Sequence, residues 1–460
     1  MPVSFFILVV LSSLAFTLHF LHIKYKNAGD FLLMIDKSEN TIIFTEAERC
    51  ILVGIAGREQ SRWETEDHLD ELESLAETSG AEIVERFIQD RPAPDPAFFV
   101  GRGKLEEIAQ FIEWNNIALV IFDDDLSPAQ IKNIENILNT KVIDRSALIL
   151  DIFADHARTN EAKVQVELAQ LNYLLPRLTR QWQHLSRQIG GIGTKGPGET
   201  QLETDRRLVR TRIAHLKTRL EKISRQSLTQ RQQRSEMFRA ALIGYTNAGK
   251  STLMNLLSGA EVLVENKLFA TLDTTVRKIN LDKNTEILLS DTVGFIRKLP
   301  HHLVASFRTT LAEAAEADLL IQVSDLSHPH FEDHLLIVNQ ILSDLKFSHK
   351  KRLLVFNKLD KVKNSGLLER IKSDYPEAVF ISASRQIGIP ALKKHILSFM
   401  EELYEVDQIK LNYLHGTAEH LFYPIAEILE RRSDDSYLYL KIKYAKENKN
   451  RIMQIAERYK

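Results

Sequence analysis

The stretch that decides the fold is Gly244-Tyr-Thr-Asn-Ala-Gly249-Lys250-Ser251, which directly follows the apolar run Ala241-Leu242-Ile243. It matches G-x-x-x-x-G-K-[ST] between an expected strand and an expected helix, the context that a phosphate-binding loop requires. In such a loop backbone N–H groups close around phosphates, the lysine reaches the terminal phosphates, and the serine hydroxyl binds Mg²⁺. The sequence therefore predicts a P-loop nucleotide-binding domain rather than a chance glycine turn.

A second element indicates which base is bound. Asn357-Lys-Leu-Asp360 follows the apolar run at residues 353–356. In N-K-x-D loops the aspartate accepts hydrogen bonds from guanine N1–H and the exocyclic amine, which adenine cannot supply, so a buried unpaired carboxylate would penalise adenine. Ser382-Ala-Ser384, after an expected strand at residues 379–381, resembles the supporting base loop. Alone, N-K-x-D could be a solvated turn, but its position after the P-loop favours GTP over ATP.

Two switch segments are expected between these elements. Asp291-Thr-Val-Gly294 follows an expected strand and matches D-x-x-G, in which the aspartate binds Mg²⁺ through water and the glycine amide senses the γ-phosphate. Phe269-Ala-Thr271-Leu-Asp273 stands where a switch loop would supply a threonine to Mg²⁺. Thr274 and Thr275 are the alternatives to Thr271.

The sequence assigns a nucleotide and Mg²⁺ site but no catalytic residue. Phe295 stands where Ras-like enzymes place the glutamine that orients the attacking water, and a phenyl ring cannot do this. We expect slow turnover until a partner completes the site, unless another residue of this chain positions the water. The expected Mg²⁺ ligands are Ser251 and Thr271. The predicted GTP-binding residues are Gly244, Tyr245, Thr246, Asn247, Ala248, Gly249, Lys250, Ser251, Thr252, Phe269, Ala270, Thr271, Leu272, Asp273, Asp291, Thr292, Val293, Gly294, Asn357, Lys358, Leu359, Asp360, Ser382, Ala383 and Ser384.

The composition bounds the rest of the chain. At 460 residues it is long enough for about three compact units. With 44% apolar and 27% charged residues it is an ordinary globular protein, which excludes disordered, collagen-like and disulfide-scaffold classes. The single cysteine, Cys50, cannot form an internal disulfide, and this fits a reducing compartment.

An uncharged leader conflicts with a soluble protein. Residues 2–23 carry no Asp, Glu, Lys or Arg and precede Lys24 and Lys26. By length this run could span a bilayer, and its basic flank would leave the rest of the chain in the cytoplasm. A cleaved signal peptide fits less well, because no charged side chain precedes the run. The alternative, which we favour, is an upstream extension before a cytoplasmic protein that begins at Met34; membrane association through residues 1–33 stays open.

Alternating strands and helices predict a small parallel α/β domain before the P-loop domain. Ser127-Pro128 is typical of a helix start, with an N-cap followed by proline. Next come two long helices around a glycine-rich loop, which suggest a helical hairpin, and the chain ends in a small α+β tail. The expected strands are residues 50–54, 81–88, 117–122 and 141–144; the helices are 64–78, 104–114, one from 128, 149–175 and 202–233; and the glycine-rich loop is 190–198.

The hairpin is strongly basic. Residues 176–240 contain 15 Lys and Arg against 5 Asp and Glu, which implies a partner with negative charge. Such a hairpin can neutralise phosphates, and its glycine-rich tip could enter a narrow RNA cavity; a solvated helix pair is the alternative. The basic residues considered are Arg177, Arg180, Arg187, Lys195, Arg206, Arg207, Arg210 and Arg212, of which Arg187, Lys195, Arg206, Arg207 and Arg210 are the predicted RNA contacts.

Three further patterns carry less weight. Gly191-Ile-Gly193-Thr-Lys-Gly196 matches a dinucleotide fingerprint but lacks the strand that should precede it. Asp123-Asp-Asp125 lies at a strand end, where we expect a solvated turn rather than a metal site. His328, His330 and His334 fall in a loop and the following helix, where a metal is not expected.

Taken together, the motifs resemble the HflX family of translational GTPases. The most specific phrases are FVGRGK at residues 99–104, GGIGTKGPGETQLETDRR at 190–207, GYTNAGKST at 244–252 and DTVGFI at 291–296. The resemblance implies a GTPase that binds the large ribosomal subunit and its RNA, not DNA, and splits or rescues stalled ribosomes under stress; we expect a monomer. Family members generally begin near the equivalent of Glu48, so the leader and the tail at residues 410–460 depart from the pattern.

The alternatives are a membrane-tethered nucleotide switch and a GTPase of ribosome assembly or RNA modification. The expected domains are a hydrophobic extension (1–47), an α/β domain (48–148), a helical hairpin (149–238), a GTPase domain (239–405) and a small α+β domain (406–460).

Overall fold

A computed structural model gives the fold of the chain. It divides into two compact units: the first comprises Met1–Ile223, Asn266–Leu272 and Lys298–Phe307, and the second comprises Ser224–Glu265, Asp273–Arg297 and Arg308–Lys460. None of the helices in the described parts combines the length and the apolar composition needed to cross a membrane. The structure describes residues 48–58, 60–179, 197–232, 237–259, 268–269, 274–282, 285–298, 312–412, 419–434 and 436–459, so the leader at 1–47 lies outside them.

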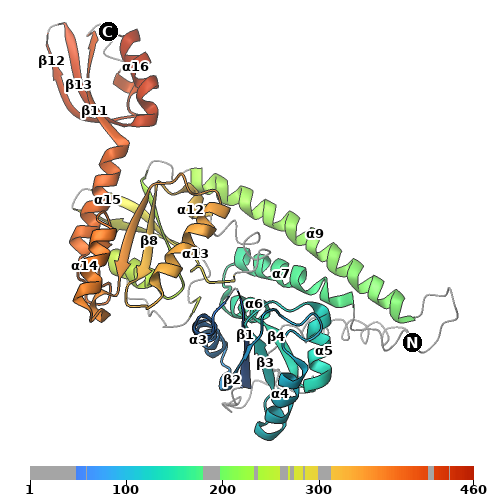
Figure 1. Cartoon of the computed structure of the whole chain (residues 1–460). Helices are drawn as coiled ribbons and strands as arrows, with labels where there is room; N and C mark the ends of the chain where they lie inside the picture. Colours follow the sequence, from blue (N-terminus) through green and yellow to red (C-terminus); the bar gives the residue numbers. More distant parts are fainter. Residues whose placement is uncertain are drawn as a thin grey trace, which may run out of the picture. The chain divides into compact units, whose positions relative to one another are not determined.

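The first unit contains a four-stranded parallel sheet with strand order β2-β1-β3-β4 (Figure 1). Ser61 and Ser127 each cap a helix through a capping box, which fixes where the helices begin. The predicted α/β domain is confirmed. Its elements are β1 (Arg49–Ala56), α3 (Arg62–Thr78), β2 (Glu82–Asp90), α4 (Arg102–Asn115), β3 (Leu119–Phe122), α5 (Pro128–Leu138) and β4 (Lys141–Asp144).

The helical hairpin follows, and it differs from the prediction at two points: its first helix is broken, and its second begins at Pro197, inside the predicted glycine-rich loop. In place of one helix over residues 149–175 there are two, because Ala157 is extended and the Thr159 side chain accepts a hydrogen bond from the Ala162 N–H and starts a new helix. The second of these packs on the long helix through Val164, Leu168, Ile213 and Leu216. The elements are α6 (Arg145–His156), α7 (Asn160–Leu174) and α9 (Pro197–Gln232), so that Pro197 and Gly198 are helical.

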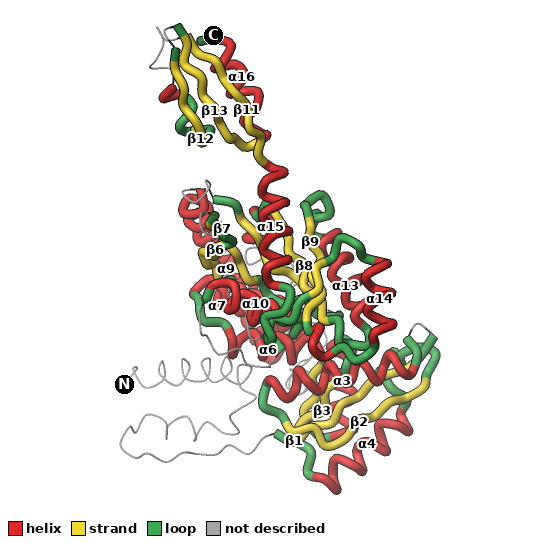
Figure 2. The backbone as a smooth tube through the Cα atoms, turned by 90° about the vertical axis from the view of Figure 1, so that its left-hand side faces the viewer, coloured by secondary structure: helices red, strands yellow, loops and turns green. Residues whose placement is uncertain are grey.

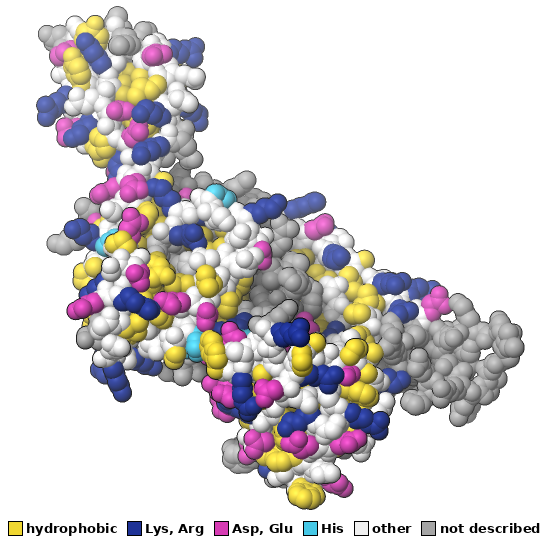
Figure 3. Space-filling model, in the orientation of Figure 1, with side chains coloured by type: hydrophobic (Ala, Val, Ile, Leu, Met, Phe, Trp, Pro, Cys, Tyr) yellow, Lys and Arg dark blue, Asp and Glu magenta, His cyan; other side chains and the backbone are white. Residues whose placement is uncertain are grey.

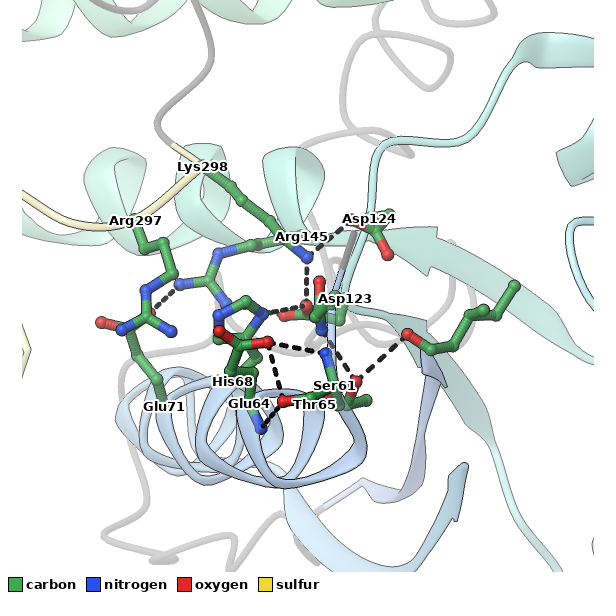
Figure 4. A network of polar contacts seen from close by, with 12 residues as sticks. Ser61, Glu64, Thr65, His68, Glu71, Asp123, Asp124, Arg145, Arg297 and Lys298 are labelled. Carbon is green, nitrogen blue, oxygen red and sulfur yellow. Dashed lines mark hydrogen bonds and ion pairs between the residues drawn. The ribbon is translucent and has the colours of Figure 1, made fainter. Parts of the chain in front are cut away.

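Asp123 does not lie in a solvated turn, and that prediction is wrong. It directly follows the buried strand β3 and is itself only 1% exposed. The guanidinium of Arg145 donates to it at 2.8 Å, and Lys298 pairs with both Asp123 and Asp124 (Figure 4). Burial alone would raise the pKa of Asp123, but Arg145, His68 and Lys298 hold it well below its usual range. Asp123 is therefore part of a buried ionic cluster of the first unit, whereas Asp125 at the end of the acidic run is exposed.

The second unit is built on a six-stranded sheet with order β10-β9-β8-β5-β7-β6, parallel except for the antiparallel edge strand β6. Helices cover both faces: α10 and α15 belong to one apolar cluster, and α13 and α14 to another (Figure 2). The elements are β5 (Arg239–Gly244), α10 (Lys250–Ser258), β6 (Thr275–Asn280), β7 (Glu286–Asp291), α12 (Ala312–Glu316), β8 (Leu319–Asp325), α13 (Phe331–Asp344), β9 (Arg352–Asn357), α14 (Ser365–Asp374), β10 (Val379–Phe380) and α15 (Ile389–Leu403).

The C-terminal tail forms the small α+β layer predicted from sequence. Three antiparallel strands in the order β11-β13-β12 are β11 (Tyr404–Asn412), β12 (Glu427–Ser433) and β13 (Tyr437–Ala445). Helix α16 (Lys449–Arg458) covers one face of this sheet through Ile452, which packs with Leu438 and Leu440 (Figure 2). Strand β11 follows α15 directly, so the tail joins the larger sheet through one continuous helix.

Candidate nucleotide-binding site

The P-loop connects β5 to α10 as the sequence predicts. Gly244 and Gly249 both adopt positive φ, at 148° and 91°. A Cβ on Gly244 would clash with the carbonyl oxygen of Val323, and one on Gly249 would clash with the side-chain amide of Asn357. These positions therefore require glycine, because a larger residue would push the loop away from β8 and β9.

The Lys250 ammonium is already held at the loop. It is 6% exposed and donates to the carbonyl oxygens of Tyr245 at 2.7 Å and Gly244 at 3.2 Å. Burial lowers its pKa to about 8, and the carboxylate of Asp291 opposes this. A Cβ on Gly294 would lie 3.0 Å from the ammonium nitrogen, so the D-x-x-G glycine and the lysine lie next to each other.

Ser251 and Asp291 meet at the start of α10. The serine hydroxyl donates to Oδ2 of Asp291 at 2.6 Å. Hydroxyl and carboxylate oxygens are the hard donors that Mg²⁺ prefers, and the ion usually keeps several waters besides one or two protein ligands. This pair fits a Mg²⁺ site: Ser251 would bind the ion directly, Asp291 would hold its water, and the ion would neutralise phosphate charge. Thr271 lies outside the described residues.

The base loops lie against the P-loop. The buried side chain of Asn357 donates to the carbonyl of Ala248 at 2.9 Å and accepts from the N–H of Ala383 at 3.0 Å. The hydroxyl of Ser382 donates to Asp360, which lowers the pKa of that carboxyl. The aspartate is therefore kept ionised as an acceptor. Next to it, Lys358 adopts φ of 61° and pairs with Asp325 at 2.8 Å.

Phe295 supplies backbone contacts, with its ring buried. Its N–H donates to the carbonyl of Gly244 at 3.0 Å, and its carbonyl accepts from the N–H of Thr246 at 2.7 Å. The ring is 3% exposed. An apolar buried ring cannot orient an attacking water, which agrees with the expectation from sequence.

The first switch segment is only partly described. Ala270, Thr271, Leu272 and Asp273 lie outside the described residues, and their predicted roles are untested. Phe269 belongs to the first unit, where its ring packs edge-to-face on Phe153 with centroids 4.6 Å apart.

Some of the basic hairpin residues have partners within the unit. Arg212 makes two hydrogen bonds to Glu167, at 2.7 and 3.0 Å. Arg177 pairs with Asp144 at 2.9 Å. These two arginines stabilise the unit, which argues against the RNA-contacting role considered for them. Arg206 is half-buried and Arg207 and Arg210 are exposed on α9, along which Figure 3 shows basic side chains; Arg180, Arg187 and Lys195 lie outside the described residues.

The sequence analysis weighed three histidines only as metal ligands and did not predict their contact with the P-loop. The ring of His334, on α13, stacks on the ring of Tyr245 with centroids 3.8 Å apart and planes 6° apart. His328 packs on His334 at 4.4 Å. The sequence holds no signal for this contact, because the histidines and the P-loop are far apart along the chain.

A P-loop, a D-x-x-G and an N-K-x-D element in this order on this sheet define the chain as a P-loop GTPase. Residues 239–358 match the family described as 50S ribosome-binding GTPase, and residues 66–154 and 156–234 match the N-terminal and middle regions of the GTP-binding GTPases. The chain belongs to the HflX family of GTPases and is a GTP hydrolase, as the sequence resemblance predicted.

The similarity to curated relatives extends over most of the chain. GTPase HflX of Flavobacterium psychrophilum is 50% identical over 378 residues, which cover 78% of this chain and 91% of that protein. GTPase HflX of Escherichia coli is 42% identical over 388 residues, which cover 84% and 90%. A solved GTP-binding protein of Sulfolobus solfataricus in complex with GDP is 25% identical, covers 77% of this chain and 99% of its own, and superposes with a TM-score of 0.40.

Proposed function

We propose that this GTPase binds the large ribosomal subunit and couples GTP hydrolysis to splitting or rescue of stalled ribosomes in the cytoplasm. The observation that carries the proposal is the basic surface of α9. Arg206, Arg207 and Arg210 follow one another along a helix that the packing of α7 holds in a hairpin. Arginines fixed on a rigid helix can contact RNA phosphates without a large ordering cost. The name of the matched GTPase family supports the same partner.

The nucleotide is proposed to bind at the P-loop, with each role taken by a group whose geometry fits it. Lys250 contacts the terminal phosphates, Ser251 and Asp291 hold Mg²⁺, and Asp360 accepts from guanine. The other P-loop, D-x-x-G and base-loop residues predicted from sequence are proposed to line the same site, and the roles of residues 269–273 stay as predicted from sequence. The proposed domain boundaries are those predicted from sequence, with the GTPase domain at residues 239–405.

The test is GTP turnover with and without purified 50S subunits, together with light scattering of 70S ribosomes. We expect slow hydrolysis by the protein alone, a large stimulation by 50S subunits, and a GTP-dependent decrease in 70S scattering. Unchanged turnover in the presence of ribosomes would argue for a switch that acts elsewhere. If 50S subunits stimulate hydrolysis but the scattering of 70S ribosomes does not change, the protein binds ribosomes without splitting them, and a role in ribosome assembly is favoured.

A further inference from the structure

The second residue of the P-loop has an aromatic side chain that is held on one face by a histidine. Tyr245 is buried, and the imidazole of His334 lies parallel to its ring at 3.8 Å. Stacked aromatic rings contribute stability beyond the burial of their area, so this contact favours one orientation of the tyrosine ring. His334 is on α13, and Tyr245 is in the P-loop, which leads into α10. The stack therefore connects α13 to the P-loop at the start of α10.

The hydroxyl of Tyr245 reaches the segment that follows D-x-x-G. It accepts a hydrogen bond from the backbone N–H of Arg297 at 2.9 Å. Together with the two backbone hydrogen bonds that Phe295 makes to Gly244 and Thr246, it ties residues 295–297 to the P-loop at three points. By accepting from the Arg297 N–H, the tyrosine hydroxyl restrains the backbone of residues 295–297, which directly follow Gly294.

The stacked imidazole is kept neutral. Burial lowers the pKa of His334 to about 3, and the neighbouring His328, Arg297 and His330 act in the same direction. A neutral ring can pack against Tyr245 without the cost of burying a charge. The stack therefore stays in one state over the whole physiological pH range.

We propose that Tyr245 and His334 are positioning residues for GTP hydrolysis. His334 fixes the ring of Tyr245, and the hydroxyl of Tyr245 fixes the backbone after Gly294, so that the Gly294 N–H is presented to the γ-phosphate. A Cβ on Gly294 would lie 2.9 Å from the Cα of Thr246, so this backbone has little room to adjust. Since Phe295 cannot orient the water, the reaction depends on backbone placement here more than in enzymes with a glutamine. The inference rests on the nucleotide site proposed above.

The test uses Tyr245→Phe, which removes the hydroxyl and keeps the ring, and His334→Ala, which removes the stack. With the full chain and no ribosomes, we expect single-turnover GTP hydrolysis to fall about three- to tenfold in Tyr245→Phe, the effect of one lost hydrogen bond. GDP affinity should not change, because GDP lacks the γ-phosphate. His334→Ala should slow hydrolysis by weakening the same hydrogen bond, between the Tyr245 hydroxyl and the Arg297 N–H. A protein with both substitutions should therefore be no slower than Tyr245→Phe alone. His334→Phe, which keeps a stacking ring, should restore the rate.

Two matched variants control for loss of a hydroxyl and of a histidine elsewhere. Tyr439→Phe loses a hydroxyl that donates to Asp434 in the C-terminal sheet, and His349→Ala alters an exposed turn; both should hydrolyse GTP like the parent. The proposal is overturned by parental turnover in Tyr245→Phe, by equal losses of GTP and GDP affinity, which indicate a structural role in the P-loop, or by effects of the two variants that multiply. Because no ribosome is present, the result does not depend on ribosome binding.

Discussion

The side-chain amide of Asn357 donates to the carbonyl of Ala248 at 2.9 Å, so the base-recognition element is fastened directly to the P-loop. The oxygen of the same amide accepts from the N–H of Ala383, which brings in the loop after β10. One buried side chain thus aligns the phosphate and base subsites. This alignment lets a single nucleotide span both.

Asn357→Ala should weaken GDP binding by about five- to a hundredfold. The substitution removes the two hydrogen bonds that align the P-loop and the base loops in the free protein, so nucleotide binding has to order these loops, at a cost of about 1–3 kcal/mol. Isothermal titration calorimetry with GDP measures the change. Asn339→Ala is the matched control, because Asn339 contacts Arg352 on the exposed surface. Equal affinities for GDP in the parent and Asn357→Ala would show that Asn357 does not align the two subsites for nucleotide binding.

Asp360→Asn should weaken guanine selectivity. In the proposed site the carboxylate accepts hydrogen bonds from two guanine donors. The amide of asparagine has only one acceptor oxygen, so GTP affinity should fall at least about tenfold, as expected for loss of a charge-assisted hydrogen bond. Competition of GTP and ATP for a fluorescent GDP analogue measures the selectivity. Asp374→Asn, at the end of α14, controls for charge. If ATP competes as well as GTP for the parent protein, the guanine assignment is wrong.

Ser251→Ala should raise the Mg²⁺ concentration needed for half-maximal hydrolysis. It removes the hydroxyl that lies 2.6 Å from Asp291 and leaves the carboxylate in place. Turnover measured over a Mg²⁺ series gives the shift. Ser343→Ala, on the exposed side of α13, should follow the parent curve. A parental Mg²⁺ curve for Ser251→Ala would exclude the hydroxyl as a ligand.

Asp123→Asn should destabilise the first unit by up to about 3–5 kcal/mol at neutral pH, because Arg145 would lose one ionised partner in the interior while it keeps Glu71. The pKa of Asp123 in the folded chain lies below its unfolded value of about 3.9, so this stabilisation is complete above that value. It is lost as pH falls toward the folded pKa. Urea unfolding at several pH values should therefore show the difference between parent and variant shrinking below about pH 4.

The control for this experiment is Asp90→Asn. Asp90 pairs with Arg62 on the surface, where both side chains are well exposed, so the loss should stay below about 1 kcal/mol at every pH. An Asp123→Asn protein as stable as the Asp90→Asn protein at pH 7 would mean that the buried cluster contributes no net stability.

The sequence predicts the parts of this fold that local patterns determine. Strand and helix alternation, Ser127 as a helix cap and the P-loop glycines are all local, and the structure confirms them. Asp123 could not be placed from its neighbours, because its partner Arg145 comes from another element and a triplet of aspartates is typical of a surface turn. The stack of His334 on Tyr245 is a long-range contact of the same kind.

The helix break at Thr159 has a local sequence signal, an N-capping threonine, but the apolar pattern around it favours an unbroken helix. Thr159 begins α7 as an N-cap, but the apolar residues on both sides of it continue a helical pattern, which predicts one long helix. The charge pattern predicts the basic excess of the hairpin but not which arginines have partners within the protein. It cannot distinguish Arg212, which pairs with Glu167, from Arg207, which is exposed.

The hairpin, rather than the GTPase domain, should provide the main contact with ribosomal RNA. Arg206 and Arg207 lie on α9, and the same helix runs to Gln232 shortly before β5, so the helix proposed to bind RNA leads into the strand that ends at the P-loop. This covalent route does not by itself demonstrate coupling. It does predict that the hairpin can be weakened without a change in the nucleotide site.

We therefore expect Arg206→Ala with Arg207→Ala to weaken binding to 50S subunits and to lower ribosome-stimulated hydrolysis, with GTP affinity unchanged. Each lost phosphate contact should reduce the slope of log affinity against log salt by about one unit, within the counterion-release description. Sedimentation with 50S subunits at several salt concentrations gives both quantities. Lys363→Ala with Lys372→Ala removes the same charge from exposed positions near and on α14 of the GTPase domain and should bind like the parent. If the arginine pair retains parental affinity and salt slope, these two side chains do not contact the RNA; if the lysine pair loses as much, the GTPase domain shares the contact equally.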